Sequence, residues 1–138
     1  MLAIGSDHAA FQFKEDIKAY LDEKGIEYED LGCFSPERTD YPIYGEKVAR
    51  AVAAGKYEKG LLFCGTGVGI SLAANKVRGI RAAVCSDCYT AALSRRHNDA
   101  NILALGARVV GIDLAKMIID TWLSSEFEGG RHADRVAM

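Results

Sequence analysis

A cysteine followed by three closely spaced glycines stands near the middle of the chain. The stretch reads Cys64-Gly65-Thr66-Gly67-Val68-Gly69 and follows the apolar run Leu61-Leu62-Phe63. Glycine lets a backbone turn sharply and approach a ligand closely, because it has no Cβ. The small residues after the loop indicate the first turn of a helix, whose free N–H groups favour a bound anion. We therefore expect an anion-binding loop that carries a thiol and, at Thr66, a hydroxyl group.

The spacing of these glycines differs from that of better-known phosphate-binding loops. A Walker loop needs a lysine directly after its last glycine, and no lysine follows here until Lys76. The dinucleotide fingerprint needs its third glycine one position later than Gly69, although Asp87 stands at about the right distance for its ribose-binding acid. If only the loop is considered, the alternative is a structural turn in which Cys64 is buried and inert.

The composition is that of one globular domain spanning residues 1–138, because 138 residues with 49% hydrophobic content suffice for a core. A net charge of −2 argues against nucleic-acid binding, which normally needs a basic face. No apolar run approaches the roughly 18 residues of a membrane span. The first residues enter a strand without the basic region of a signal peptide. A chain of this size needs no disulfides, so its four cysteines predict a reduced, cytoplasmic protein.

Apolar runs and helical spacings alternate along the chain. Strands are predicted at residues 1–5, 26–31, 60–63, 80–84 and 101–105, with helices between them. Asp113 is expected to cap the helix after the last strand. This alternation predicts an α/β fold with a five-stranded parallel sheet that is covered by helices on both faces.

The carboxyl ends of parallel strands meet at one edge of a sheet, where ligands bind. This rule brings together Asp7 and His8 after the first strand, the loop 64–71 after the third, and Asp87 after the fourth. His97 and Asn98 instead precede the last strand, so they are expected toward the opposite edge. If they belong to the site, a curled helix end or a neighbouring subunit must supply them.

Four separated segments are together more specific than the glycine loop alone. They are Gly5-Ser6-Asp7-His8-Ala9-Ala10, the loop 64–69, Arg95-Arg96-His97-Asn98-Asp99-Ala100-Asn101 and Gly129-Gly130-Arg131-His132-Ala133-Asp134-Arg135-Val136. In this order they resemble the type B ribose-5-phosphate isomerases over essentially the whole chain. The resemblance implies a Rossmann-like three-layer α/β/α sandwich with no cofactor and no metal. It also implies a homodimer, with a tetramer left open, whose active sites lie at the subunit interface and could receive His97 from a neighbour.

In this family the catalytic base falls on Cys64. Isomerisation of an aldose to a ketose needs a base that moves a proton between adjacent carbons, and donors that stabilise an enediolate. A free thiol is mostly protonated at neutral pH, so the helix start after the loop is needed to favour the thiolate. Residues 71–75 offer no carboxylate, which some relatives use as the base instead. The enediolate donors are expected to be Thr66 and the backbone of Gly65, Gly67, Val68 and Gly69.

The resemblance assigns proton-transfer and binding roles to three further polar residues. His97 is the candidate for opening the furanose ring, because an imidazole exchanges protons near neutral pH. Asp7 would bind a sugar hydroxyl or move its proton, and Asn98 would donate to the enediolate. The structural alternatives are an N-cap of the first helix for Asp7 and a helix end for Asn98.

Two arginines near the end of the chain suit a phosphate group. Arg131 and Arg135 stand four residues apart, on one face of a helix, and guanidinium groups bind phosphate in a bidentate manner. A solvated basic tail is the alternative. His8 and Arg108 are further phosphate candidates, and Tyr41 is expected to line the sugar site. The segment 124–138 is expected to dock at the active site or the subunit interface.

We therefore predict an isomerase that interconverts D-ribose 5-phosphate and D-ribulose 5-phosphate. Its expected partners are a sugar phosphate and other copies of the chain, with no nucleic acid and no membrane. One alternative is a hexose-6-phosphate isomerase acting on allose or galactose 6-phosphate, and another is a non-catalytic nucleotide- or sugar-phosphate-binding module. Cys85 and Cys88 have C-x-x-C spacing without a second metal-binding pair and are predicted to be inert.

Overall fold

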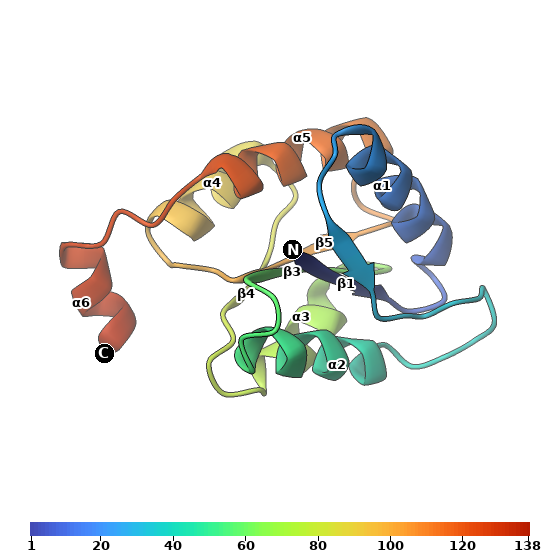
Figure 1. Cartoon of the computed structure of the whole chain (residues 1–138), viewed down its shortest axis with the longest axis horizontal. Coiled ribbons are helices and arrows are strands. Elements are labelled where there is room, and N and C mark those ends of the chain that lie inside the picture. The colour runs from blue at the N-terminus through green and yellow to red at the C-terminus, as the bar shows by residue number, and fades with distance from the viewer.

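Five parallel strands form one sheet, and helices lie on both of its faces (Figure 1). The computed structural model describes all 138 residues. The strands are β1 (Leu2–Ser6), β2 (Tyr28–Asp30), β3 (Lys59–Cys64), β4 (Ala82–Val84) and β5 (Ile102–Gly106). The helices are α1 (Phe11–Glu23), α2 (Tyr41–Ala53), α3 (Val68–Asn75), α4 (Cys88–Arg96), α5 (Ile112–Ser124) and α6 (Arg131–Ala137). The predicted α/β fold with a five-stranded parallel sheet is confirmed.

The order of the strands reverses between β1 and β3. The order is β2-β1-β3-β5-β4, so the chain leaves β1 toward one side and resumes with β3 on the other. Open α/β sheets bind ligands beyond the carboxyl ends of the strands at such a reversal. The backbone N–H of Asp7 donates to the carbonyl oxygen of Phe63 over 3.3 Å and joins the two strand ends at this point.

Successive side chains of β3 point to opposite faces of the sheet and enter two separate cores. Leu61 and Phe63 pack with buried residues of α1 and α5. Leu62 and Cys64 pack on the other side with buried residues of α2 and α3. Figure 1 shows this layering, with α1, α4 and α5 above the sheet and α2 and α3 below it. The thiol of Cys64 therefore lies on the same face of the sheet as the helix that follows it.

Two details of the sequence prediction are wrong. The edge strands β2 and β4 have three residues each, shorter than the predicted ranges 26–31 and 80–84, because each edge strand has only one neighbour to pair with. The N-cap of α5 is Gly111, not Asp113. The helix begins one residue before Asp113, whose carboxylate lies in the first turn and favours the helix there through the dipole.

The C-terminal helix α6 stands apart from the layered body of the molecule. Figure 1 shows α6 extending beyond the end of α4, on the side opposite the loop between β2 and α2. The segment between α5 and α6 is hydrogen-bonded to the end of α4, and one face of α6 packs against His97 there. No helix of the structure is both long and apolar enough to cross a lipid bilayer.

Candidate active site

Cys64 is the last residue of β3 and lies at the floor of the glycine loop. The residue is only 4% exposed, so the thiol is not at the lip of the loop but beneath it. The backbone N–H of Gly67 donates to its sulfur over 3.2 Å. A hydrogen bond from an N–H group at a helix N-terminus stabilises a thiolate, because both the donor and the helix dipole favour negative charge there.

Two glycines make this geometry possible. Gly67 has φ = 80°, which side chains rarely tolerate, and it is the N-cap of α3. Gly106, at the end of β5, lies so close to the loop that a Cβ there would come within 2.6 Å of the carbonyl carbon and oxygen of Thr66. The sequence analysis missed Gly106. The sequence did contain one indication: Gly106 directly follows the apolar run 102–105, at the strand end that lies beside the loop.

The loop has backbone donors to offer to an anion. The N–H of Val68 bonds to the hydroxyl oxygen of Thr66 over 3.2 Å, and the N–H of Gly67 is engaged by the sulfur. These two predicted enediolate donors are therefore already used within the loop. In contrast, the N–H groups of Thr66, Gly69 and Ile70 make no hydrogen bond within the chain. Unpaired N–H groups at a helix start are the donors that a developing oxyanion needs.

Other predicted residues surround this loop. Asp7 is buried after β1, and its Oδ1 accepts the N–H of Ala10 over 3.2 Å, although Ala10 and not Asp7 is the N-cap of α1. Nδ1 of His8 lies 3.1 Å from the backbone nitrogen of Thr39 and 2.9 Å from its carbonyl oxygen, which fixes the imidazole. The ring of Tyr41 lies against Gly69, where a Cβ would come within 2.8 Å of its Cζ.

Arg108 completes this group from the segment after β5. Its backbone N–H donates to the carbonyl oxygen of Gly65 over 3.0 Å, and its guanidinium lies over the same glycine. We call this assembly the cysteine cradle; it consists of Asp7, His8, Tyr41, residues 64–69 and Arg108. All of its members lie beyond the carboxyl ends of β1, β3 and β5 or at the start of α2.

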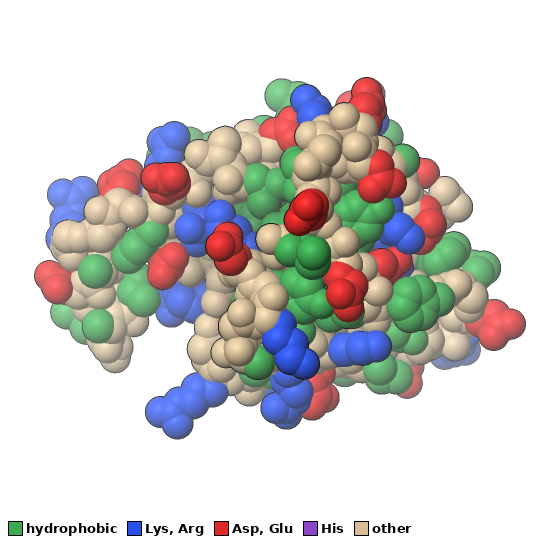
Figure 2. Space-filling model, viewed as in Figure 1, with side chains coloured by type: hydrophobic (Ala, Val, Ile, Leu, Met, Phe, Trp, Pro, Cys, Tyr) green, Lys and Arg blue, Asp and Glu red, His purple; other side chains and the backbone are tan.

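The remaining predicted residues lie elsewhere. A cavity of about 320 Å³ is lined by two arginines, two histidines and Asn98, and we call it the histidine pocket. Figure 2 shows the notch that separates α6 from the body of the molecule in this region. Arg131 is exposed on the same helix as Arg135, as predicted, but it does not line the cavity. The lining residues are Arg81, Leu93, His97, Asn98, His132, Arg135 and Val136.

His97 forms a cluster with two residues that the sequence analysis did not select. Its imidazole stacks on that of His132 with ring centroids 4.1 Å apart and planes 9° from parallel. Oε1 of Glu128 lies 3.5 Å from Nε2 of His132 and 3.9 Å from Nε2 of His97. Burial, the nearby His97 and the positive charge of Arg131 lower the pKa of His132. No local motif marked this cluster, because its members are brought together only by the docking of α6.

The same three side chains are the chain's one candidate for a metal site, since their donor atoms lie within 4.8 Å of one another. The lone pairs of two imidazole ligands must converge on the ion. The rings here are nearly parallel and stacked, so their lone pairs do not converge. Arg81 and Arg135 also line the pocket and oppose a dication. The arrangement fits proton transfer and anion binding better than metal binding.

Cys85 and Cys88 show no sign of reactivity that would support a redox role. Burial raises the pKa of the Cys85 thiol to about 11, which keeps it protonated at neutral pH. All four cysteines are free thiols.

Within one chain, the cysteine cradle and the histidine pocket do not form one site. The cradle lies at the carboxyl ends of the strands, whereas His97 follows α4, which runs back to the amino end of β5. In Figure 1, α6 and the loop between β2 and α2 lie at opposite ends of the molecule. Cys64 therefore does not share a cavity with Arg135 within a single chain. The reason is the one given in the sequence analysis: His97 precedes β5, whereas the loop follows β3, so the two lie toward opposite edges of the sheet.

The chain is similar to known proteins along essentially its whole length. A family model described as Ribose/Galactose Isomerase matches residues 2–138. The chain is 59% identical over 135 residues to ribose-5-phosphate isomerase B of Escherichia coli (strain K12), which covers 98% of this chain and 91% of that protein. It is 47% identical over 137 residues to a D-erythrulose-4-phosphate isomerase of Pectobacterium atrosepticum, with coverages of 98% and 90%. The solved structure of a ribose-5-phosphate isomerase B from Clostridium thermocellum matches with a TM-score of 0.97 at 57% identity, covering 99% of this chain and 92% of that one.

Proposed function

This chain belongs to the ribose/galactose isomerase family, and from that premise we propose that it interconverts D-ribose 5-phosphate and D-ribulose 5-phosphate. The observation that carries the proposal is the cysteine cradle. It sets a hydrogen-bonded thiol beneath a helix start that has unpaired N–H groups. These are the base and the oxyanion donors that an aldose–ketose isomerisation requires.

The chemistry follows from the position of the sulfur. The Cys64 thiolate takes the proton from C2 of the open-chain aldose, which leaves an enediolate spread over O1 and O2. The same proton then returns to C1, while a proton moves between O2 and O1 by way of Asp7. Hydrogen leaves and returns as a proton, so no electron acceptor takes part. The unpaired N–H groups of Thr66, Gly69 and Ile70 support this path, because they can hold the enediolate oxygens.

The site is complete only when two copies of the chain meet. Neither the ring opener His97 nor the phosphate-binding Arg135 can reach the cradle of its own chain, so His97 and Arg135 act on the cradle of a partner subunit. In a two-fold dimer each chain offers both halves, and the dimer then has two equal sites. The segment 124–138, which docks on α4 of its own chain, carries α6 to that interface.

An apolar surface beside the cradle supports such a dimer. Val68 and Leu72 of α3 are 47% and 61% exposed, and Val84, at the end of the edge strand β4, lies against Gly67 of the loop. Tyr89 and Val109 are exposed near the same strand ends. Exposed apolar side chains that cluster around a functional loop are typical of an interface. A partner seated on this surface would also shield the thiolate from water.

The test is turnover of purified protein on D-ribose 5-phosphate, followed by the formation of D-ribulose 5-phosphate. The control is a Cys64→Ala variant purified in the same way, which measures any contaminating isomerase from the host. We expect the wild-type protein to be active and the control to be inactive. Equal low turnover by both proteins would contradict the proposal.

A four-carbon substrate is a second candidate, since one relative at 47% identity is a D-erythrulose-4-phosphate isomerase. The same assay with D-erythrose 4-phosphate and D-allose 6-phosphate ranks the three substrates by kcat/KM. We expect D-ribose 5-phosphate to give the highest value. A higher value for either of the others would reassign the substrate but leave the mechanism at Cys64 intact.

A further inference from the structure

A second imidazole lies directly behind the one that opens the ring. His97 is the C-cap of α4 and is partly exposed, whereas His132 of α6 is only 7% exposed. The two rings are stacked 4.1 Å apart and nearly parallel. Two imidazolium cations at that separation would repel one another strongly.

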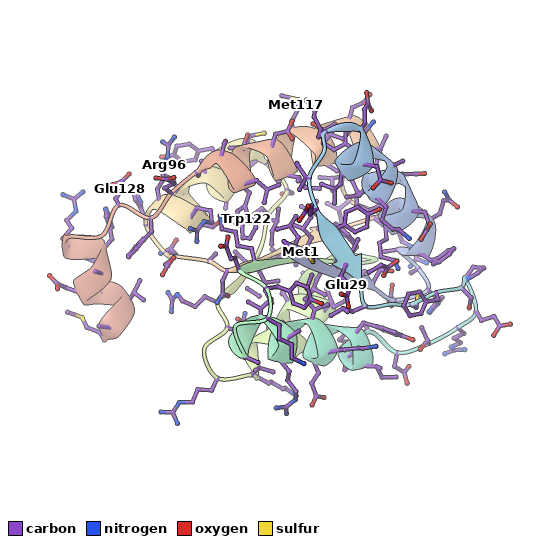
Figure 3. The ribbon with its side chains drawn as sticks, in the orientation of Figure 1. Met1, Glu29, Arg96, Met117, Trp122 and Glu128 are labelled. Carbon is purple, nitrogen blue, oxygen red and sulfur yellow. The ribbon has the colours of Figure 1, made fainter.

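A single carboxylate faces the same nitrogen of both rings. Oε1 of Glu128 lies 3.9 Å from Nε2 of His97 and 3.5 Å from Nε2 of His132. Figure 3 shows Glu128 in the segment that joins α5 to α6, close to Arg96. The backbone N–H of Glu128 donates to the carbonyl oxygen of Arg96 over 3.0 Å, which anchors the residue at the end of α4. Both distances are longer than a direct hydrogen bond, so the carboxylate would contact either nitrogen through a small movement of its side chain or through one bridging water.

The charged side chains that line this cavity are all basic. Arg81 and Arg135 line the same cavity, and Arg131 lies on the same helix as His132. Burial, His97 and Arg131 lower the pKa of His132, which disfavours a proton on this ring. Glu128 is the carboxylate that faces both rings. The imidazole of His132 packs against one face of the His97 ring, and the carboxylate of Glu128 faces its edge. Together they favour one tautomer and one orientation of His97.

We propose that Glu128 is a positioning residue that holds the Nε2–H of His97, so that Nδ1 is the atom that accepts the anomeric proton of the sugar. This inference rests on the proposed function of His97. A carboxylate that bonds to one ring nitrogen fixes the tautomer and leaves the other nitrogen as the base. In the step itself, the proton of O1 passes to Nδ1, and the C1–O4 bond breaks as the C1=O1 carbonyl forms. The imidazolium then returns the proton to O4, so no proton is gained or lost overall.

The variant that tests this role is Glu128→Gln, which keeps the size of the side chain but removes its charge. The matched control is Glu126→Gln, which alters an exposed carboxylate in the same segment. We expect kcat/KM for D-ribose 5-phosphate to fall about tenfold in Glu128→Gln, which is part of the 10²–10⁴-fold that proton transfer contributes. The acid limb of its pH profile should also move to lower pH, because the variant has no negative charge beside the ring. The control should change neither quantity.

A second measurement needs no substrate. Nitrogen-15 NMR distinguishes the Nδ1–H tautomer of histidine from the Nε2–H tautomer, and the chain has only three histidines to assign. We expect His97 to be the Nε2–H tautomer in the wild-type protein and to become mixed in Glu128→Gln. An Nδ1–H tautomer in the wild type, or an unchanged spectrum and pH profile in the variant, would overturn the proposal. If the protein lacked isomerase activity altogether, the proposed function would fail while the NMR result still decided the tautomer.

Discussion

Cys64→Ala should lower kcat for D-ribose 5-phosphate by about 10³-fold or more, with sugar-phosphate affinity nearly unchanged. The substitution removes the only group that we assign to proton transfer at carbon, and such a group commonly contributes 10²–10⁴-fold. The phosphate and hydroxyl contacts do not involve the sulfur, so binding should survive. Turnover assays give kcat, and calorimetry with D-ribose 5-phosphate gives the affinity of the inactive variant.

The matched control for this prediction is Cys88→Ala. It removes a thiol of intermediate exposure at the start of α4, which packs against the core on the opposite face of the sheet from Cys64. This variant should keep wild-type turnover, which would show that the effect belongs to the sulfur at the end of β3. If Cys64→Ala kept more than about a tenth of the wild-type kcat, a different residue would have to be the base.

His97→Ala should show the second-largest effect, and the effect should depend on the substrate. Ribose 5-phosphate is a furanose in solution and must be opened before its C2 proton becomes acidic. Erythrose 4-phosphate cannot form that ring, because its O4 carries the phosphate. We therefore expect kcat/KM to fall about 10²–10³-fold on ribose 5-phosphate, and by much less on the four-carbon sugar.

The measurement is kcat/KM on ribose 5-phosphate divided by kcat/KM on erythrose 4-phosphate. This ratio in the variant is then divided by the same ratio in the wild-type protein. A residue that opens rings changes this double ratio, whereas a residue that only supports the fold lowers both rates together. His132→Ala offers a comparison in which the neighbouring ring is removed while His97 remains. An equal loss on both substrates would remove His97 from the ring-opening step.

The sequence predicted the cysteine cradle well because most of it is local. The thiol, the glycines and the helix start are neighbours in the chain, and their spacing alone indicates a tight turn at a strand end. The position of Asp7 and His8 followed from one topological rule, that the ends of parallel strands meet. That inference does not depend on the order of the strands in the sheet, which the sequence did not predict.

The features that were missed depend on contacts between distant segments. Gly106 matters only because β5 lies beside β3, and nothing near Gly106 in the sequence reveals that neighbour. Glu128 and His132 gain their role when α6 docks on the end of α4, about 30 residues earlier in the chain. The wrong N-cap at Asp113 has a smaller cause. An extended glycine can begin a helix without any side-chain cap, and the pattern of polar residues does not show this.

The separation of His97 from Cys64 was visible in the sequence and is now explained by the topology. A helix that follows a parallel strand returns to the opposite edge of the sheet, so a residue at its end cannot face the strand ends of the same chain. The family resemblance pointed to a subunit interface. A single chain keeps its two groups of predicted residues apart, and we therefore propose that the groups meet where two copies of the chain associate.

The most direct test of a site shared between two copies mixes Cys64→Ala with His97→Ala. Each variant alone is nearly inactive, because every site lacks one of the two groups. The two are unfolded together in equal amounts, refolded, and assayed on D-ribose 5-phosphate. Random pairing makes half of the dimers mixed, and each mixed dimer has one intact and one doubly altered site, so activity should recover to about a quarter of the wild-type value. Activity that stays at the average of the two separate variants would show that Cys64 and His97 do not meet across a subunit interface.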